Sequence, residues 1–273
     1  MPNRAAEEFI RLVETMATLR SPGGCPWDRE QTIDSLKPFV LEETYEVLDA
    51  IDRHDHQALC EELGDFVFEA VFLAQMESEA GHFTIADSLK AIADKLVRRH
   101  PHVFARGEGE AALDSAGQVR ARWEEIKAAE RAGSATAQTL LSGIAPALPA
   151  LLRTYHIGMR AASVNFDWTR VEDVVAKIQE EVDELREVVE AGAEVSQARA
   201  EEEMGDLLFS IANLARKLGI EPETALRKAN DKFTRRFTAM ERAIADTGRT
   251  MTDMPLDELE QEWRRIKVRL QAP

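Results

Sequence analysis

Residues 41–51 read LEETYEVLDAI and residues 61–68 read EELGDFVF, and the same pattern returns as QEEVDELREVV at 179–189 and EEMGDLLF at 202–209. The two pairs keep one order and a similar spacing, which is typical of an internal repeat. Within each segment, apolar residues recur every three or four positions, as they do on one face of an α-helix. The sequence therefore predicts a pair of neighbouring amphipathic helices that occurs twice.

Further matched segments extend the repeat along the chain. They are CPWD around Trp27 with FDW around Trp168, LKAIADKLVRR at 89–99 with LRKANDKFTRR at 226–236, and WEEIK at 123–127 with WRRIK at 263–267. Between the copies, small residues and the prolines Pro146 and Pro149 are typical of a linker. We therefore expect a first helical domain at residues 1–132, a linker at 133–149 and a second helical domain at 150–273.

The composition of the whole chain favours helices. Of its 273 residues, 44% are hydrophobic and 31% are charged, which suits a packed core, whereas only 6% are aromatic. Strand-type alternation is scarce, which argues against an all-β sandwich or barrel. Gly81 and Gly219 follow apolar periodic runs as candidate helix ends, while Pro222 and Pro255 stand where first helical turns would begin. The predicted fold class is all-α, with two tandem homologous helical-bundle halves of four or five helices each.

The formal net charge of −16 argues against a protein that coats nucleic acid or an anionic membrane. Cys25 and Cys60 form no disulfide framework, and the first residues carry acids without an apolar run, so we expect a cytoplasmic location. The most apolar stretch, FVFEAVFLAQM at 66–76, is interrupted by Glu69 and is too short to span a bilayer.

The acids of the repeated segments point to chemistry. On a helix, residues three or four apart share a face, so Glu181 projects with Glu184, and on the next helix Glu203 projects with Asp206. Acids that converge from two antiparallel helices repel one another, and a hard divalent cation such as Mg²⁺, or else Mn²⁺, would offset that repulsion. The first half repeats the set as Glu43, Glu46, Glu62 and Asp65. The alternative interpretation is that all of these are solvated surface acids.

A row of basic residues in the second half supplies the opposite charge. Lys228, Lys232 and Arg236 are spaced four residues apart and therefore share a helix face. Asn230 and Arg235 lie beside them in the sequence. A cation-binding carboxylate cluster opposite a basic face suits a ligand with several phosphates. The alternative is a basic helix face that only pairs with surface acids.

With these segments assembled, the chain resembles the two-domain MazG nucleoside triphosphate pyrophosphohydrolases. The resemblance runs from about Leu12 to Lys267 and rests on CPWD, LEETYEVLDAI, EELGD, DKLVRRHPHVF, FDW, EEMGDLLF and KANDKFTRRF, in family order. It implies an all-α fold, a homodimer whose chains build the helical units together, and Mg²⁺-dependent hydrolysis of nucleoside triphosphates to monophosphate and pyrophosphate.

The resemblance also implies roles for individual residues. It places the metal ligands at Glu181, Glu184, Glu203 and Asp206. It places nucleotide contacts around Lys177, Lys232, Arg235, Arg236 and Trp263, to which the basic row adds Lys228 and Asn230. Glu180 is our candidate for orienting or deprotonating the attacking water. Trp263 is expected either to stack on the base, with tolerance for different bases, or to belong to the core.

The second half is expected to be the active one. The family associates activity with the C-terminal half, and the ungapped alignment puts Ala91 and Ala93 where the second half has Lys228 and Asn230. We therefore predict weaker or no turnover in the first half, with a structural or regulatory role. Two other functions stay open at this point: a non-catalytic helical regulator that senses nucleotides or docks a partner, and a purely structural dimeric bundle.

Overall fold

The computed structural model describes residues 2–105, 139–190 and 197–270, together with residues 115, 117–119, 122, 123, 126 and 130. Part of the predicted linker, 133–138, and part of the WEEIK segment, including Lys127, lie outside the described residues. The described residues form helices and turns without any strand, so the all-α prediction is confirmed for them. The chain divides into two compact units, residues 1–132 and 133–273.

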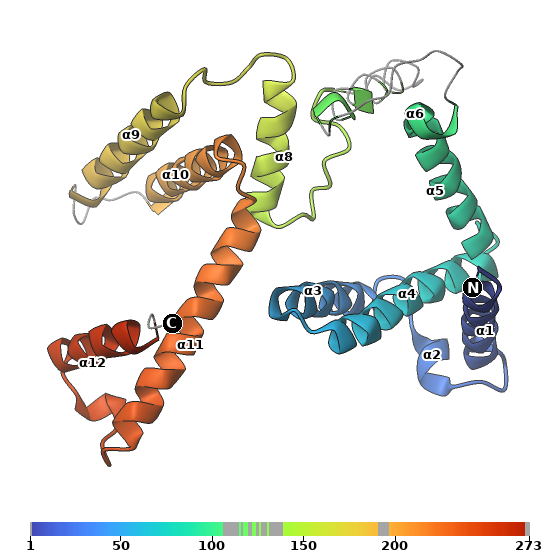
Figure 1. Ribbon diagram of the computed structural model, residues 1–273, viewed down its shortest axis with the longest axis horizontal. Coiled ribbons are helices and arrows are strands. Elements are labelled where there is room, and N and C mark those ends of the chain that lie inside the picture. The colour runs from blue at the N-terminus through green and yellow to red at the C-terminus, as the bar shows by residue number, and fades with distance from the viewer. Residues whose placement is uncertain are drawn as a thin grey trace. The chain divides into compact units, whose positions relative to one another are not determined.

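Up to residue 105 the first unit contains α1 (Pro2–Arg20), α2 (Pro26–Glu30), α3 (Lys37–Arg53), α4 (His56–Glu79), α5 (Ile85–Arg99) and α6 (Pro101–Phe104), and described residues between 117 and 130 are helical as well. Two of them are short pieces that begin at a proline, and they bring the number above the four or five that we predicted. α3 and α4 lie side by side, and α1 also packs on α4 (Figure 1).

A tight connection holds α3 against α4. His54 ends α3 in the left-handed backbone region, with φ of 55°. The side chain of Asp55 then caps α4 by accepting hydrogen bonds from the backbone N–H groups of Gln57 and Ala58. Further along α4, Val71 and Phe72 are buried against Met16 of α1. This contact holds the later part of α4 against α1. The acids near the start of α4 are therefore held opposite α3.

The second unit contains α8 (Ala150–Ala162), α9 (Val171–Glu190), α10 (Gln197–Lys217), α11 (Pro222–Ala245), the 3₁₀ helix η2 (Met251–Asp253) and α12 (Leu256–Arg269). α9 and α8 both pack against α10 (Figure 1). Asp167, just before α9, forms ion pairs with Arg216 at 2.6 Å and Lys217 at 2.7 Å. These ion pairs tie the start of α9 to the end of α10.

α11 is a long helix that leads away from the α9–α10 pair, and α12 packs on its far part (Figure 1). Met240, Ile244 and Ile266 form a small buried core between α11 and α12. Trp263 packs against this core from α12. The described residues of the second unit thus include an apolar cluster that is built around the far part of α11.

The predicted helix ends are confirmed at two glycines. Gly81 follows α4 with φ of 75°, and Gly219 follows α10 with φ of 71°, a backbone region that glycine adopts without steric cost. Pro222 is the first residue of α11, as predicted. Pro255 differs slightly, because it stands as the N-cap just before α12.

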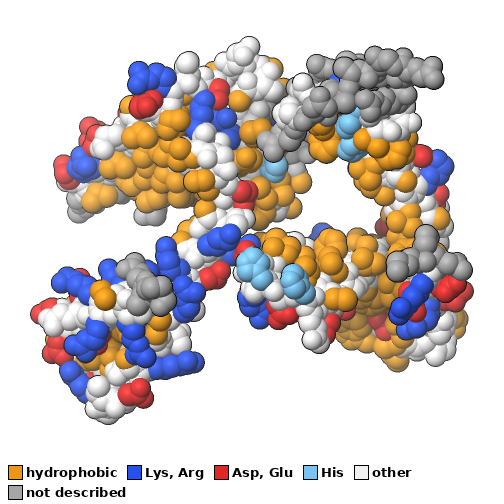
Figure 2. Space-filling view, in the orientation of Figure 1, with side chains coloured by type: hydrophobic (Ala, Val, Ile, Leu, Met, Phe, Trp, Pro, Cys, Tyr) orange, Lys and Arg blue, Asp and Glu red, His pale blue; other side chains and the backbone are white. Residues whose placement is uncertain are grey.

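Large apolar side chains remain exposed on both units. On α10 they form a stripe of Met204, Leu208 and Ile211, which are 44%, 46% and 43% exposed. Leu63 and Val67 occupy the matching positions on α4 and are also exposed. Figure 2 shows such apolar side chains spread over the α9–α10 part of the molecule. Among the helices of the described ranges, none has the length and apolar character that crossing a membrane requires.

Candidate metal and nucleotide site

Three acids meet where α9 and α10 pack together. Glu181 and Glu184 come from α9 and Glu203 comes from α10, and one carboxylate oxygen of each lies within 4.8 Å of the others. Glu181 is buried, whereas Glu184 and Glu203 are half-buried. The predicted pairing of acids from two neighbouring helices is present for these three residues.

The charge of Glu181 is only partly balanced. Its Oε1 lies 2.8 Å from Nζ of Lys177, one helical turn earlier. Its Oε2 is buried and has no hydrogen-bond partner among the described residues. Lys177 also binds Glu180 at 2.8 Å, and these two acids raise the pKa of the lysine well above its usual value. One carboxylate oxygen is therefore left inside the cluster without a positive partner.

Burial and like charge also act on Glu184. Burial raises the pKa of the Glu184 carboxyl, and the neighbouring charges of Glu203 and Glu181 raise it further. A cluster of carboxylates that repel one another in partly buried surroundings is the donor set that a hard divalent cation prefers. The three acids therefore fit Mg²⁺ or Mn²⁺.

Divalent-cation binding should strengthen as the pH rises. Because the folded-state pKa of Glu184 is raised, the cation-free protein is relatively more stable below that pKa and loses this stability as the pH rises through it. A cation binds the ionised acids and competes with protons. We expect the gain in melting temperature with Mg²⁺ over EDTA to be small near about pH 5 and larger by several degrees near about pH 8. Thermal melts along a pH series, of the unmodified chain and of Lys177→Met, check this prediction. An equal gain in melting temperature at all pH values would contradict it.

Two other acids of the predicted site lie outside this group. Asp206 is one turn beyond Glu203 on α10 and is exposed, and it does not belong to the group within 4.8 Å. Glu180 is exposed on α9 and binds Lys177. The structure therefore gathers three of the four predicted ligands.

The predicted nucleotide contacts are spread along α11 and α12. Lys228, Asn230, Lys232 and Arg235 are exposed on α11. Arg236 is half-buried, and its Nε has no hydrogen-bond partner among the described residues. Trp263 is half-buried on α12, with its ring 5.1 Å from that of Phe233. The acid cluster belongs to α9 and α10, whereas the basic row belongs to α11, a helix that leads away from that pair (Figure 1).

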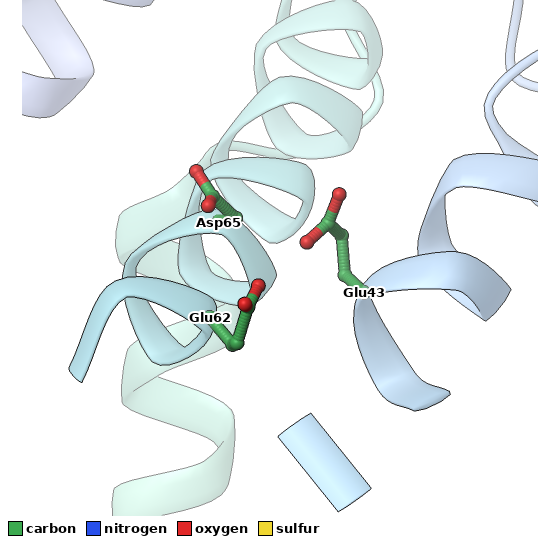
Figure 3. Close-up of side chains that lie close together, drawn as sticks. All are labelled: Glu43, Glu62 and Asp65. Carbon is green, nitrogen blue, oxygen red and sulfur yellow. The ribbon is translucent and has the colours of Figure 1, made fainter. Parts of the chain in front are cut away.

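The first unit contains an acid cluster of the same kind. Glu43 on α3 faces Glu62 and Asp65 on α4, with oxygens within 4.8 Å of one another (Figure 3). Burial and the surrounding acids raise the pKa of both Glu43 and Glu62. Glu46 is exposed, and its charge and its side-chain hydrogen bond with Glu62 both raise the pKa of the Glu62 carboxyl. The structure therefore gathers three of the four acids that were predicted for the first unit.

Two residues of the first unit were missed by the sequence analysis as parts of a site. Glu69 is a buried acid on α4, and its only sequence signal is that it interrupts an apolar run. Glu130 forms ion pairs with Arg98 at 2.9 Å and Arg99 at 2.7 Å. Arg98 and Arg99 match Arg235 and Arg236 in the repeat, but the sequence does not indicate that Glu130 pairs with them. The two arginines lower the pKa of Glu130 to about 2.

Comparison with known proteins covers both units. A family model for the MazG nucleotide pyrophosphohydrolase domain matches residues 31–104 and 170–239. The nucleoside triphosphate pyrophosphohydrolase of Escherichia coli K12 is 50% identical over 262 residues, 95% of this chain and 97% of that protein. A Thermotoga maritima protein named nucleoside triphosphate pyrophosphohydrolase/pyrophosphatase MazG is 43% identical over 259 residues, 95% of both chains. The two matched ranges contain the two acid clusters.

Proposed function

Since the chain belongs to the MazG nucleotide pyrophosphohydrolase family, we propose that it hydrolyses nucleoside triphosphates between the α and β phosphates. The products are a nucleoside monophosphate and pyrophosphate, and the substrates include ribo- and deoxyribonucleotides with different bases. The observation that carries this proposal is the cluster of Glu181, Glu184 and Glu203, whose oxygens lie close enough together to share one cation.

A divalent cation, Mg²⁺ or Mn²⁺, fits the carboxylate donors of this cluster. When bound, it polarises a phosphoryl group and lowers the pKa of a bound water. Glu181, Glu184 and Glu203 would hold the cation from two helices, and Asp206 would join them from the next turn of α10. The unpartnered Oε2 of Glu181 supports this role, because a buried carboxylate oxygen without a partner is costly.

Other side chains of the second unit would act on the water and the phosphates. Glu180, which is exposed one residue before Glu181 on α9, would orient or deprotonate the attacking water. Lys177 would turn from the acids to the phosphates once a cation balances Glu181. The basic row of α11, with Arg235, would stabilise charge on the departing pyrophosphate. Trp263 would stack on the base with the part of its ring that stays exposed.

We also propose that the working form is a homodimer. The exposed stripe of Met204, Leu208 and Ile211 is apolar surface of the kind that marks protein interfaces. In one chain, α11 carries its basic residues away from the α9–α10 acids (Figure 1). A second copy packed on the stripe would bury it and could bring basic residues of its own to the acids. This arrangement gives a symmetric pair of sites.

Turnover is proposed to be weak or absent in the first unit. Ala91 and Ala93 stand at the positions that match Lys228 and Asn230 of α11, so the first unit lacks this lysine and this amide. Arg98 and Arg99, which match Arg235 and Arg236, are held by the carboxylate of Glu130. A triphosphate would have to displace this carboxylate before the two arginines could bind it.

Replacing Glu130 with glutamine is therefore expected to tighten binding of a triphosphate to the first unit by about tenfold. The measurement is calorimetric titration of a full-length chain in which Glu181→Gln disables the second unit, with a non-hydrolysable triphosphate and Mg²⁺. Glu14→Gln, at an exposed acid of α1, is the matched control. Equal affinities for the Glu130→Gln and Glu14→Gln chains would contradict the role given to Glu130.

The proposed activity itself is tested with the purified chain, Mg²⁺ and a panel of ribo- and deoxyribonucleoside triphosphates. Pyrophosphate and orthophosphate are measured separately. We expect pyrophosphate and monophosphate in equal amounts. Release of orthophosphate with diphosphate would contradict cleavage between the α and β phosphates. Binding without any cleavage would instead favour a nucleotide-sensing regulator.

A further inference from the structure

A groove follows the contact between the far part of α11 and α12. It consists of two neighbouring cavities of about 350 and 320 Å³, which share Ala243 of α11 with Ile266 and Arg269 of α12. Ile266 is buried and Ala243 is half-buried, so these two side chains give the groove an apolar floor. Each volume lies at the lower end of the range for small-molecule sites, about 300–1,000 Å³. The groove is therefore large enough for a small ligand.

The side chains around this groove are mainly basic. Four arginines line it, with Arg249 and Arg265 in the first cavity, Arg242 in the second and Arg269 in both. The acids of the two linings are Glu262 and Asp246. Figure 2 shows Lys and Arg side chains gathered over the part of the molecule that α12 and the far part of α11 form. In a chain with a formal net charge of −16, positive charge thus prevails in the groove.

Two of these arginines have no carboxylate to balance them. Arg242 and Arg269 form no ion pair and no side-chain hydrogen bond with any of the described residues. The other two are exposed and paired, Arg265 with Glu262 at 3.0 Å and Arg249 with Glu258 at 2.8 Å. Exposed ion pairs contribute little to stability, so a phosphate can replace the carboxylate. Because a guanidinium group binds phosphate oxygens through parallel hydrogen bonds, the groove suits a phosphate-bearing anion.

The groove is separate from the proposed nucleotide contacts. Arg242 follows Arg236 by six residues, which is about 9 Å along the helix axis. Trp263 packs with its ring 5.1 Å from that of Phe233, and neither of these residues lines the two cavities. The basic row of α11 does not line them either. An anion in the groove would therefore leave the proposed triphosphate contacts free.

We propose that this groove binds an oligophosphate anion, an ion with two or more linked phosphates, and that the anion clamps α12 to α11. Arg242 and Arg269 line one cavity from the two helices, so they would hold different phosphates of the same ion. Free pyrophosphate and the phosphate chain of a nucleotide share this chemistry. The proposal goes beyond hydrolysis and does not depend on it, because the groove includes neither the acid cluster nor the basic row.

The test is calorimetric titration of the full chain in EDTA, which keeps divalent cations away from the acid clusters. Inorganic pyrophosphate and a non-hydrolysable nucleoside triphosphate are titrated separately, so the result shows whether the free ion or the nucleotide is the ligand. Orthophosphate serves as the single-phosphate comparison. We expect pyrophosphate, the triphosphate or both to bind at least about tenfold more tightly than orthophosphate, because one phosphate cannot bind both arginines equally well.

Variants place the anion in the groove. Replacing both Arg242→Gln and Arg269→Gln should weaken binding by at least about tenfold. Asp246→Asn should strengthen it severalfold, because it removes a negative charge from the lining. Arg264→Gln, at an exposed arginine of α12 outside the lining, is the matched control and should keep the affinity of the unmodified chain. Lys232→Gln should keep it as well, since the basic row lies outside the groove.

Thermal melting shows that the variants are folded, and the bound anion should raise the melting temperature of the unmodified chain but not that of the double variant. If the double variant fails to fold, each single arginine variant tests the groove. The proposal is overturned if no oligophosphate binds in EDTA, if orthophosphate binds as tightly, or if the double variant and Arg264→Gln bind equally. A loss of binding in Lys232→Gln would also overturn it. Pyrophosphate release with Mg²⁺ is a separate measurement, so failure of this proposal can be told from failure of the proposed activity.

Discussion

Replacing Glu181 with glutamine is expected to lower the rate of pyrophosphate release by about a hundredfold or more. Glutamine keeps the size of the side chain and an oxygen for Lys177, but it removes the charge that faces Glu184 and Glu203. The remaining acids, Glu184 and Glu203 with Asp206 one turn further along α10, would hold a divalent cation poorly, so the triphosphate would lose its anchor. The rate is measured with saturating Mg²⁺ and triphosphate, and Mg²⁺ should no longer raise the melting temperature through this site.

The fold should survive this change. Because Oε2 of Glu181 is buried without a hydrogen-bond partner among the described residues, removing its charge should leave the melting temperature in EDTA unchanged or higher. Glu187→Gln, at an exposed acid two turns further along α9, is the matched control and should keep full activity. Full activity of the Glu181→Gln chain would remove the metal assignment.

Replacing Leu208 with glutamate should dissociate the proposed dimer into monomers and abolish most of the activity. Leu208 is the middle residue of the exposed apolar stripe of α10, and a dimer packed on this stripe would have to bury the new charge. A buried charge without a partner costs several kcal/mol, about enough to dissociate a micromolar dimer. Light scattering after size-exclusion chromatography measures the mass, and the pyrophosphate assay measures the activity.

A control for this prediction adds the same charge to the same helix. Ala198 is exposed in the first turn of α10, where an extra acid is favourable to the helix dipole. Ala198→Glu should therefore stay dimeric and active. An unmodified chain that is monomeric and active, or a dimeric Leu208→Glu chain, would show that the stripe is not the interface.

The acid clusters could be predicted from the sequence because their geometry is local. Residues three apart on a helix share a face, so Glu181 and Glu184 lie on the same side of α9 regardless of the rest of the fold. Glu203 joins them because a single connection places α10 beside α9. Asp206 shows the limit of this reasoning, since it shares a face with Glu203 but stays exposed outside the group.

Other parts of the site depend on tertiary contacts, which the periodicity of a helix does not predict. The direction of α11 is set by the turn at Gly219 and the cap at Glu221, and it carries the basic row away from the α9–α10 pair. The partner of Arg98 and Arg99 lies more than thirty residues away in the sequence, at Glu130. Glu69 only interrupts an apolar run in the sequence, and the fold is needed to show that its side chain is buried.

The most direct test of the central claim is a crystal structure of the chain with Mn²⁺ and a non-hydrolysable triphosphate, in which anomalous scattering locates the metal. We predict a Mn²⁺ peak in the second unit between the carboxylates of Glu181, Glu184 and Glu203, with triphosphate oxygens completing its coordination. A triphosphate bound elsewhere, or these three carboxylates turned to solvent around no metal, would contradict the account.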